Sequence, residues 1–373
     1  MFSEKNLINC DNSFRKLINS CLDENIISID TEFVRNKTFY PQLCLLQIGT
    51  STGSYAIDPN KISNLSLLKK ILRNKNILKI FHSPRQDIEI FFNLFGSLPN
   101  NIFDTQIAYS FISQEYQISY EKIVLNILKI KLDKTFQYYD WTLRPINENQ
   151  LNYALNDVYY LRKIYFKLEK KLKSKNRFDW ALEESKIYLN KKLYLNSPEN
   201  YWKNIYPSKT KNLNLFKLKQ IFEWREEKCI TSNISRKLVF SDKDLVTLIK
   251  NPKNLTSLNL KYKLEKKDLI VIDKILSNNS DTLLEKKSKL IKSDFELLII
   301  LKIILKLISN ELNISPNLIA TTSDLEKLNF KNNKHSRLFK SWRNEVFGEK
   351  IKKFFNNELK IVSKENNFFL EKN

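Results

Sequence analysis

The stretch Ile26-Ile27-Ser28-Ile29-Asp30-Thr31-Glu32-Phe33-Val34 is the starting point for predicting the fold. Its apolar and β-branched residues predict a buried strand, and two acids interrupt the pattern near its end. Side chains alternate along a strand, so Asp30 and Glu32 point to the same face. Two neighbouring carboxylates on a mostly buried strand repel each other and lose hydration, which is costly unless a cation or a shared proton compensates. The pattern is thus equally consistent with a metal site and with a half-exposed strand that carries a solvated acidic face.

Net charge indicates the class of partner. The chain has 373 residues, with 63 Lys+Arg against 41 Asp+Glu and a formal net charge of +22. This length is enough for two or three domains with their own cores. The positive charge favours polyanionic partners, nucleic acid first and an anionic membrane surface second. Lysine, asparagine and isoleucine are all abundant, which indicates a biased composition that accounts for part of this charge.

The numbers of cysteines and histidines limit the kinds of metal site and catalytic site that the chain can form. The 4 cysteines are scattered without a CxxC pair, which predicts free thiols in a cytoplasmic protein. With 2 histidines, His-based metal sites and Ser-His-Asp catalysis are nearly excluded, so catalysis must depend on carboxylates. The N-terminus has no signal-peptide pattern. The most apolar run, Leu297 to Ile308, is interrupted by lysines and too short to span a bilayer, so we expect a buried helix and no membrane association.

The first half of the chain predicts an α/β layer. Three strands with short links (26–34, 43–49 and 54–58) form an antiparallel meander, and the segment from Gly49 to Gly53 is a hairpin turn. A helix over about 62–72 leads to a strand at 77–81. Ser83 is predicted to cap the next helix, with Pro84 in its first turn. A fifth strand at 101–104 precedes further helices. The prediction is a mixed five-stranded sheet flanked by helices.

Beyond about Lys170 the strand signals stop and lysine-rich helical segments continue to the C-terminus. The segment Trp224-Arg225-Glu226-Glu227 recurs as Trp342-Arg343-Asn344-Glu345. Two copies of a small helical module explain this similarity, and chance is the alternative. In either case we expect the two tryptophans to be core anchors rather than base-stacking platforms.

Two further acids can join the first pair. Asp87 lies in the first turn of the helix after the fourth strand, where an acid also complements the helix dipole. Tyr153 and Asp157 share a helical face, separate from the apolar stripe of the same helix. Taken alone, such a pair is usually a surface contact.

The order of these residues resembles one family. An Asp-x-Glu strand, a later helical Asp and a Tyr-x-x-x-Asp helix resemble the DEDD exonucleases of the tyrosine variant, and the chain is identified as similar to the ribonuclease D family. The matching segments are DTEFVR (30–35), FHSPRQDIEI (81–90), FDTQIA (103–108), DWTLRP (140–145) and YALNDVYYL (153–161). The resemblance implies a ribonuclease-H-like exonuclease domain over 1–195, an HRDC domain over 208–287 and a second HRDC-like helical domain over 288–373.

The resemblance also implies the reaction. We expect a 3′→5′ exoribonuclease that hydrolyses RNA 3′ ends with two divalent ions, Mg²⁺ or Mn²⁺, and releases nucleoside 5′-monophosphates, with tRNA precursors and other structured RNAs among its substrates. Asp30 would bridge both ions, Glu32 and Asp157 would complete the ion that carries the attacking water, and Asp87 would hold the second ion through a water molecule. Tyr153 would orient the attacking water and help to deprotonate it, with the metal providing most of the activation. Hard ions prefer carboxylate oxygens, which agrees with four acids and almost no histidine.

Three residues are weaker candidates for substrate binding. His82 could touch substrate, although a structural histidine is the stronger alternative. Gln106 follows a strand end and could contact a ribose or phosphate. Trp141 could stack on a base, or the segment from Asp140 to Pro145 could be a packed turn at the rim of the site.

Two other functions remain open at this point. The same acids serve DNA-directed 3′→5′ exonucleases, and a nucleic-acid-binding scaffold could carry a catalytically silent site. The complete set of acids argues against the scaffold. We expect the chain to act as a monomer.

Overall fold

The computed structural model describes residues 2–133, 135–136, 139–195, 214–251, 264–278, 292–328, 336–365 and 367–373. The predicted domain boundaries at 208 and at 287/288 lie outside these ranges. None of the helices described is both long and apolar enough to cross a membrane. Cys10, Cys21, Cys44 and Cys229 are all free thiols, as predicted.

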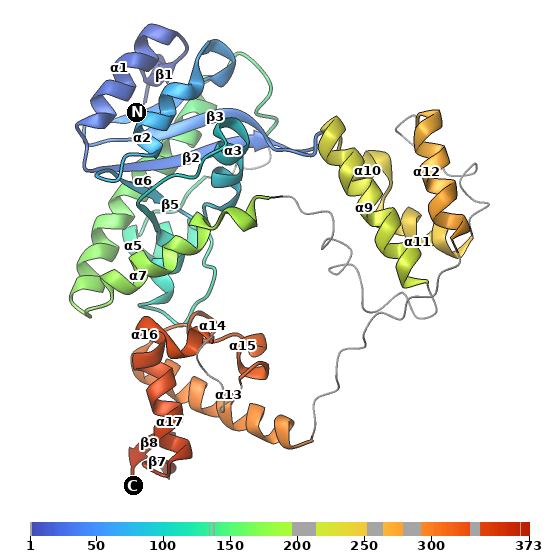
Figure 1. Cartoon of the computed structure of the whole chain (residues 1–373). Coiled ribbons are helices and arrows are strands. Elements are labelled where there is room, and N and C mark those ends of the chain that lie inside the picture. Colours follow the sequence, from blue (N-terminus) through green and yellow to red (C-terminus); the bar gives the residue numbers. More distant parts are fainter. Residues whose placement is uncertain are drawn as a thin grey trace.

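The N-terminal part is a mixed sheet with helices on both faces (Figure 1). The strands are β1 Leu7–Ile8, β2 Ile26–Val34, β3 Gln42–Gly49, β4 Ser54–Ile57, β5 Leu78–Phe81 and β6 Ile102–Asp104. The helices are α1 Asp11–Leu22, α2 Leu68–Leu72, α3 Arg85–Phe95, α4 Thr105–Ser110, α5 Tyr120–Leu128, α6 Glu148–Lys173 and α7 Phe178–Ser185.

Strand β2 lies at the centre of the sheet, in the order β1-β4-β3-β2-β5-β6. It pairs antiparallel with β3 and parallel with β5, and β3 pairs antiparallel with β4, so the predicted meander is confirmed. The predicted count of five strands is wrong, because β1 adds a sixth strand parallel to β4. That strand has only two residues, too few to give a period-2 pattern in the sequence.

The two faces of β2 have different roles because its side chains alternate. Ile27 and Ile29 belong to the hydrophobic cluster that also contains Phe14 of α1 and Phe91 of α3. Ser28, Asp30 and Glu32 have the opposite parity and point to the other face, over which α6 packs against β2, β3 and β4.

Two local predictions are corrected. Ser83 does not cap α3, because it adopts a left-handed conformation (φ 57°) and its backbone N–H donates to Asp104 at 2.9 Å; α3 begins at Arg85. The helix expected over 62–72 is confined to α2, preceded by short 3₁₀ turns at Pro59–Lys61 and Leu65–Leu67. Asn64 accepts from the N–H of Ser66 and begins the second of these turns, so regular helix starts later.

The C-terminal part contains two helical units, which lie on different sides of the N-terminal part (Figure 1). The first helical unit comprises α9 Leu215–Ser232, α10 Arg236–Val239, α11 Asp242–Lys250 and α12 Lys266–Ser277. The second helical unit comprises α13 Lys292–Leu312, α14 Pro316–Ile319, α15 Thr322–Glu326, α16 Ser341–Arg343, α17 Glu349–Phe355, β7 Leu359–Lys364 and β8 Asn367–Lys372. The β7–β8 hairpin corrects the expectation that this region is all helical. Residues 297–308 form a helix, α13, as predicted, but it is buried along one side only, because Ile299 and Ile303 are exposed.

The internal repeat is real but lies in a different place from the Trp-Arg segments. Trp224 is on α9, the first helix of its unit, whereas Trp342 is on α16, after the third. The matching feature is Asn-Ile-Ser, at 233–235 and 313–315. Both asparagines have φ 49°, and in both copies a short helix and then a Ser or Thr capping box follow.

Both arginines nevertheless have a similar structural role. Arg225 donates to the carbonyl of Phe240, which ends α10, and Arg343 donates to the carbonyls of Leu318 and Ile319, which end α14. Each guanidinium therefore satisfies helix-end carbonyls that lack intrahelical partners. Trp342 is buried and Trp224 packs against the core of its unit, so the expectation that they are core anchors is confirmed.

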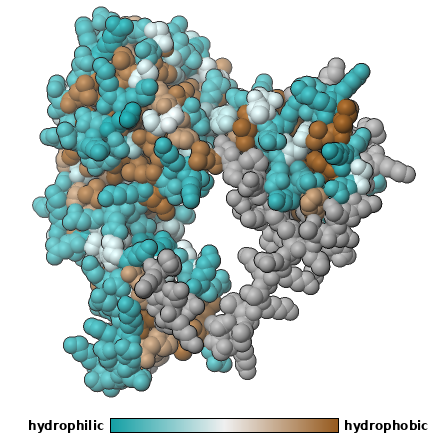
Figure 2. All heavy atoms as spheres, in the orientation of Figure 1, coloured by the Kyte–Doolittle hydropathy of each residue, from teal (hydrophilic) through white to brown (hydrophobic). Residues whose placement is uncertain are grey.

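The visible surface is mostly hydrophilic, with hydrophobic side chains interspersed (Figure 2). The second helical unit and the N-terminal part share one hydrophobic cluster, and this cluster includes Phe111, Ala181 and Trp342. The Trp342 ring stacks on Trp180 of α7, with centroids 5.6 Å apart. The unit is thus packed onto the sheet domain rather than tethered to it.

Helix α6 approaches the sheet closely at one point. The Ser28 hydroxyl donates to the carbonyl of Val158 at 2.7 Å, and both groups are buried. A Cβ atom added at Gly49 would lie 2.3 Å from Ser28 Oγ and 3.0 Å from this carbonyl oxygen. Glycine at position 49 therefore allows α6 to rest on the sheet.

We predict that Gly49→Ala lowers the free energy of unfolding by about 1–3 kcal/mol, because the added methyl group overpacks this contact. It should also lower catalytic activity by displacing α6. Gly53→Ala is the matched control, since its Cβ would meet only the outer end of the Tyr55 ring, at 3.3 Å or more. Urea unfolding of both variants measures the difference, and equal stability would contradict the proposed close contact.

Candidate active site

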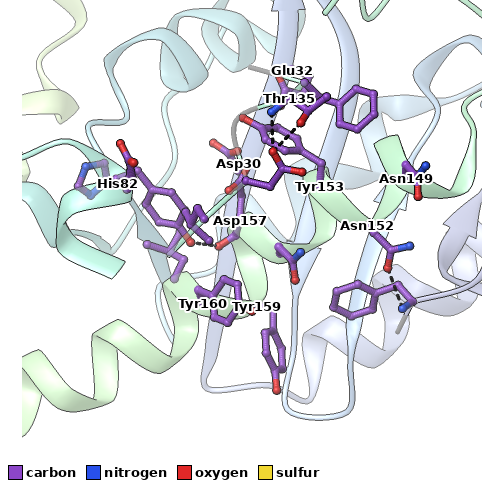
Figure 3. Close-up of a pocket in the computed structure, with 18 of the residues that line it drawn as sticks. Asp30, Glu32, His82, Thr135, Asn149, Asn152, Tyr153, Asp157, Tyr159 and Tyr160 are labelled. Carbon is purple, nitrogen blue, oxygen red and sulfur yellow. Dashed lines mark hydrogen bonds between the residues drawn. The ribbon is translucent and has the colours of Figure 1, made fainter. Parts of the chain in front are cut away.

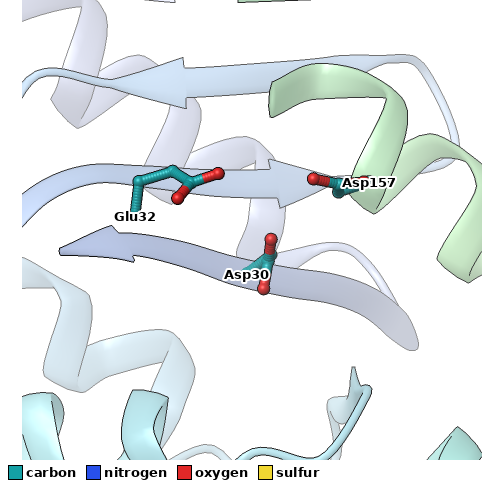
Figure 4. A group of neighbouring side chains, drawn as sticks. All are labelled: Asp30, Glu32 and Asp157. Carbon is teal, nitrogen blue, oxygen red and sulfur yellow. The ribbon is translucent and has the colours of Figure 1, made fainter. Parts of the chain in front are cut away.

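Three carboxylates converge between β2 and α6 (Figure 4). Asp30, Glu32 and Asp157 each offer an oxygen within 4.8 Å of the others. The first two come from β2, and Asp157 comes from the face of α6 that lies on the sheet. The Asn147–Gln150 capping box begins α6 and fixes its first turn. The structure therefore brings together three of the predicted acids.

Asp87 is not in this group, because α3 packs on the opposite face of the sheet. Its carboxylate accepts a hydrogen bond from the Thr31 hydroxyl at 2.5 Å. Thr31 lies between the two acids of β2 and points away from them by strand alternation. Asp87 is nevertheless close enough that its charge raises the pKa of Asp30. Asp87 therefore lies next to the site but approaches it from the opposite face of the sheet.

The pKa values follow from burial and mutual repulsion. Burial raises the pKa of Asp30 well above its usual range, and the charges of Asp87, Asp157 and Glu32 raise it further. The pKa of Glu32 is raised by burial and then by Asp157 and Asp87. Burial raises the pKa of Asp157 to about 7 and that of Asp87 to about 6. A close group of carboxylates that repel one another suits a hard divalent ion such as Mg²⁺.

Tyr153 lies one helical turn before Asp157 and lines the same cavity (Figure 3). Its ring packs against Phe136 and Trp141, at centroid distances of 6.0 and 6.2 Å. Burial and the nearby charges of Asp157, Glu32 and Asp30 raise the pKa of its phenol. The hydroxyl therefore stays protonated near neutral pH, where it can donate a hydrogen bond.

The cavity beside the acids has a volume of about 1220 Å³. Sequence reasoning missed much of its lining, including Tyr120, Asn149, Asn152, Asn156 and Tyr160. The Tyr120 hydroxyl donates to the carbonyl of Asp157, and thereby fixes the turn of α6 that carries this acid. The helical spacing of the asparagines with Tyr153 and Asp157 was a signal that could have placed them on this face.

His82 has a structural environment. Its two ring nitrogens lie 2.9 Å from the Thr105 hydroxyl and 3.0 Å from the carbonyl of Ile118, and burial lowers its pKa to about 4. The ring still lines the cavity as a neutral group. Gln106 donates to the same carbonyl at 3.0 Å and is not part of the lining.

Trp141 is 3% exposed and packs behind Tyr153, which favours the packed-turn alternative over base stacking. The turn is fixed by Arg144, which donates to both oxygens of Asp58 at 2.7 and 2.9 Å and to the carbonyl of Cys44 at 2.7 Å. This segment supports the rim of the site from behind.

Comparisons with known proteins agree with this geometry. A family model described as 3'-5' exonuclease matches residues 6–173. The ribonuclease D of Bartonella henselae is 36% identical over 90% of this chain and 86% of its own length, and that of Zymomonas mobilis is 30% identical over 87% of each. The Escherichia coli RNase D structure, an exoribonuclease involved in structured RNA processing, superposes with a TM-score of 0.79 at 27% identity, covering 94% of this chain and 98% of that one. A Bifidobacterium adolescentis protein shares the fold, with a TM-score of 0.72 at 17% identity over 92% of this chain and 95% of that one.

We predict an effect of pH on the metal-free protein. Acids whose pKa is raised on folding hold protons that the unfolded chain has lost, so their contribution makes folding less favourable as pH rises from about 4 to above 7. Mg²⁺ should then raise the melting temperature much more at pH 8 than at pH 5, where protons compete with it.

The control for this prediction is Asp30→Asn, which removes one of the repelling charges. Without Mg²⁺ at pH 8, this variant should melt at a higher temperature than the wild type. Adding Mg²⁺ should then raise its melting temperature much less than that of the wild type. Equal Mg²⁺ shifts for wild type and variant at both pH values would contradict a metal site at these acids.

Proposed function

Because the chain belongs to the ribonuclease D family, we propose that it is a 3′→5′ exoribonuclease that releases nucleoside 5′-monophosphates, with tRNA precursors and other structured RNAs among its substrates. The observation that carries this proposal is the convergence of Asp30, Glu32 and Asp157 beside Tyr153 in one cavity. The presence of all four acids, three of which converge in the cavity, argues against a catalytically silent scaffold.

The acids would hold two divalent ions, Mg²⁺ or Mn²⁺. Asp30 is the proposed shared ligand, because its carboxylate lies with Glu32 and Asp157 while its pKa also responds to the charge of Asp87. The ions would supply activation of water and stabilisation of the charge that develops on the phosphate and the leaving oxygen. Asp87, held by Thr31, is the fourth proposed ligand.

Tyr153 would position the attacking water. Its raised pKa excludes a phenolate near neutral pH, so its contribution is a directed hydrogen bond rather than removal of a proton. The packing of the ring against Phe136 and Trp141 fixes the direction of the hydroxyl.

The remaining chain would bind the body of the RNA. We propose that residues 1–195 form the exonuclease domain and that 208–287 and 288–373 are HRDC-type domains, the second extended by the β7–β8 hairpin. Their lysines suit contacts to phosphates that do not depend on base sequence. We further propose that the protein acts in the cytoplasm as a monomer.

The alternative substrate is DNA, which the same acids can hydrolyse. Hydrolysis of matched RNA and DNA oligomers under the same Mg²⁺ concentration distinguishes the two. The proposal requires a clear preference for RNA.

We predict that Asp30→Asn abolishes hydrolysis while RNA binding and the fold are nearly unchanged, because the amide packs like the carboxylate but cannot serve as an anionic bridging ligand. Release of mononucleotides and the RNA dissociation constant should be measured on one preparation. More than about a tenth of the wild-type rate at saturating Mg²⁺ would remove Asp30 from the mechanism.

We predict that Tyr153→Phe lowers kcat by about 10²-fold with little change in KM, because it deletes one aligned hydrogen bond and keeps the ring packing. A purely structural tyrosine would instead show a nearly unchanged kcat and a lower melting temperature. Measuring kcat, KM and melting temperature together separates these outcomes.

A further inference from the structure

The loop between β2 and β3 is held by the first helical unit. This loop, Arg35 to Pro41, directly follows the strand that carries Asp30 and Glu32. Phe39 of the loop is 2% exposed and belongs to the hydrophobic core of the helical unit, together with Leu218 and Phe222 of α9. A side chain of the exonuclease domain thus completes the core of another unit.

Polar contacts hold the loop on both sides of Phe39. The N–H of Ser235 donates to the carbonyl of Lys37 at 2.9 Å, and the N–H of Tyr40 donates to the Asn233 side chain at 3.0 Å. The guanidinium of Arg236 lies 4.7 Å from the centre of the Phe39 ring. The contact therefore fixes the backbone as well as the ring.

The same loop is linked to the helix that carries Asp87. Arg35 donates to the carbonyl of Phe39 at 2.8 Å and forms an ion pair with Glu89 of α3 at 3.0 Å. Glu89 lies two residues after Asp87 on α3. On the strand side, the register of β2 shifts between Glu32 and Phe33, next to the start of the loop. The loop therefore connects two of the elements that supply acids to the site.

The second helical unit provides a contrast. Its Asn-Ile-Ser turn, residues 313–315, contacts the exonuclease domain in the equivalent way. Asn313 donates to the carbonyl of Ile112 at 3.1 Å, and the N–H of Ser315 donates to the carbonyl of Ser110 at 2.9 Å. These carbonyls end α4 or follow it, and α4 carries none of the acids. The two copies of the repeat thus contact the exonuclease domain through the same Asn-Ile-Ser turn. In the described part of the chain, only the turn of the first copy contacts a segment that adjoins the acids.

We propose that the first helical unit positions the catalytic acids, with Phe39 and Arg35 as positioning residues for Glu32 and Asp87. The unit then contributes to the chemical step even for a substrate too short to reach it. This inference rests on the proposed assignment of the acids as metal ligands. Small displacements of catalytic groups are enough to slow catalysis, because metal ligands and the reacting water must be aligned.

The test uses Asn233→Gly and its matched control Asn313→Gly. Glycine accepts the left-handed backbone at both positions, so each variant loses only the side-chain contact to the exonuclease domain. The substrate is the shortest oligoribonucleotide that the wild-type chain degrades, starting from a dinucleotide. Phe39→Ala is the stronger variant, and Phe39→Leu should restore most of its loss.

We expect Asn233→Gly to raise the Mg²⁺ concentration for half-maximal rate and to lower kcat several-fold, and Phe39→Ala to lower kcat by about 10-fold or more, with KM for the short substrate little changed. Asn313→Gly should stay near the wild-type values. If Phe39→Ala unfolds the first helical unit, Asn233→Gly still decides the question.

Unchanged kcat and Mg²⁺ dependence in Asn233→Gly and in a folded Phe39→Ala variant, with weaker binding of long RNA alone, would overturn the inference. The first helical unit would then act only by holding RNA. This outcome can be distinguished from failure of the proposed function, because in that case the Asp30→Asn variant would still hydrolyse RNA.

Discussion

The close contact between α6 and β2 is the constraint on which the site depends. The hydrogen bond from Ser28 to the carbonyl of Val158 joins the two elements one residue away from Asp157 and two residues away from Asp30. Gly49 on β3 leaves the space for this contact. Without the close packing, the acids of the strand and the acid of the helix would be separate surface features. With it, three carboxylates lie within 4.8 Å of one another.

This arrangement opposes folding in the absence of a cation. Burial raises the pKa of Asp30, Glu32 and Asp157, and neighbouring negative charges raise those of Asp30 and Glu32 further. The metal-free site therefore opposes folding, and the surrounding core must offset this cost. The hydrophobic clusters on both faces of β2 supply that compensation. The same repulsion would favour binding of a divalent ion at the proposed site, because a bound cation relieves it. The same group of residues therefore affects both the stability of the fold and the proposed catalysis.

The sequence was most informative where a pattern was regular. Alternation along β2 placed Asp30 and Glu32 on one face, and helical spacing placed Tyr153 with Asp157; both are seen in the structure. It was least informative where a residue depends on a distant partner. Thr31 holds Asp87, Tyr120 holds the carbonyl of Asp157 and Phe39 enters another unit, and no local pattern indicates any of these contacts. Ser83 carried a capping signal, but its bond to Asp104 imposed a different backbone. The true repeat was hidden because Asn-Ile-Ser is short and the two Trp-Arg segments suggested another alignment.

The central claim is that acids from β2, α6 and α3 together hold two divalent ions. Anomalous diffraction from crystals grown with Mn²⁺ tests this most directly, because it locates each ion independently of catalysis. The account predicts two peaks in the cavity, both in contact with Asp30, with Glu32 and Asp157 at one and Asp87 beside the other. A cavity without Mn²⁺ peaks, or ions bound away from Asp30, would contradict it.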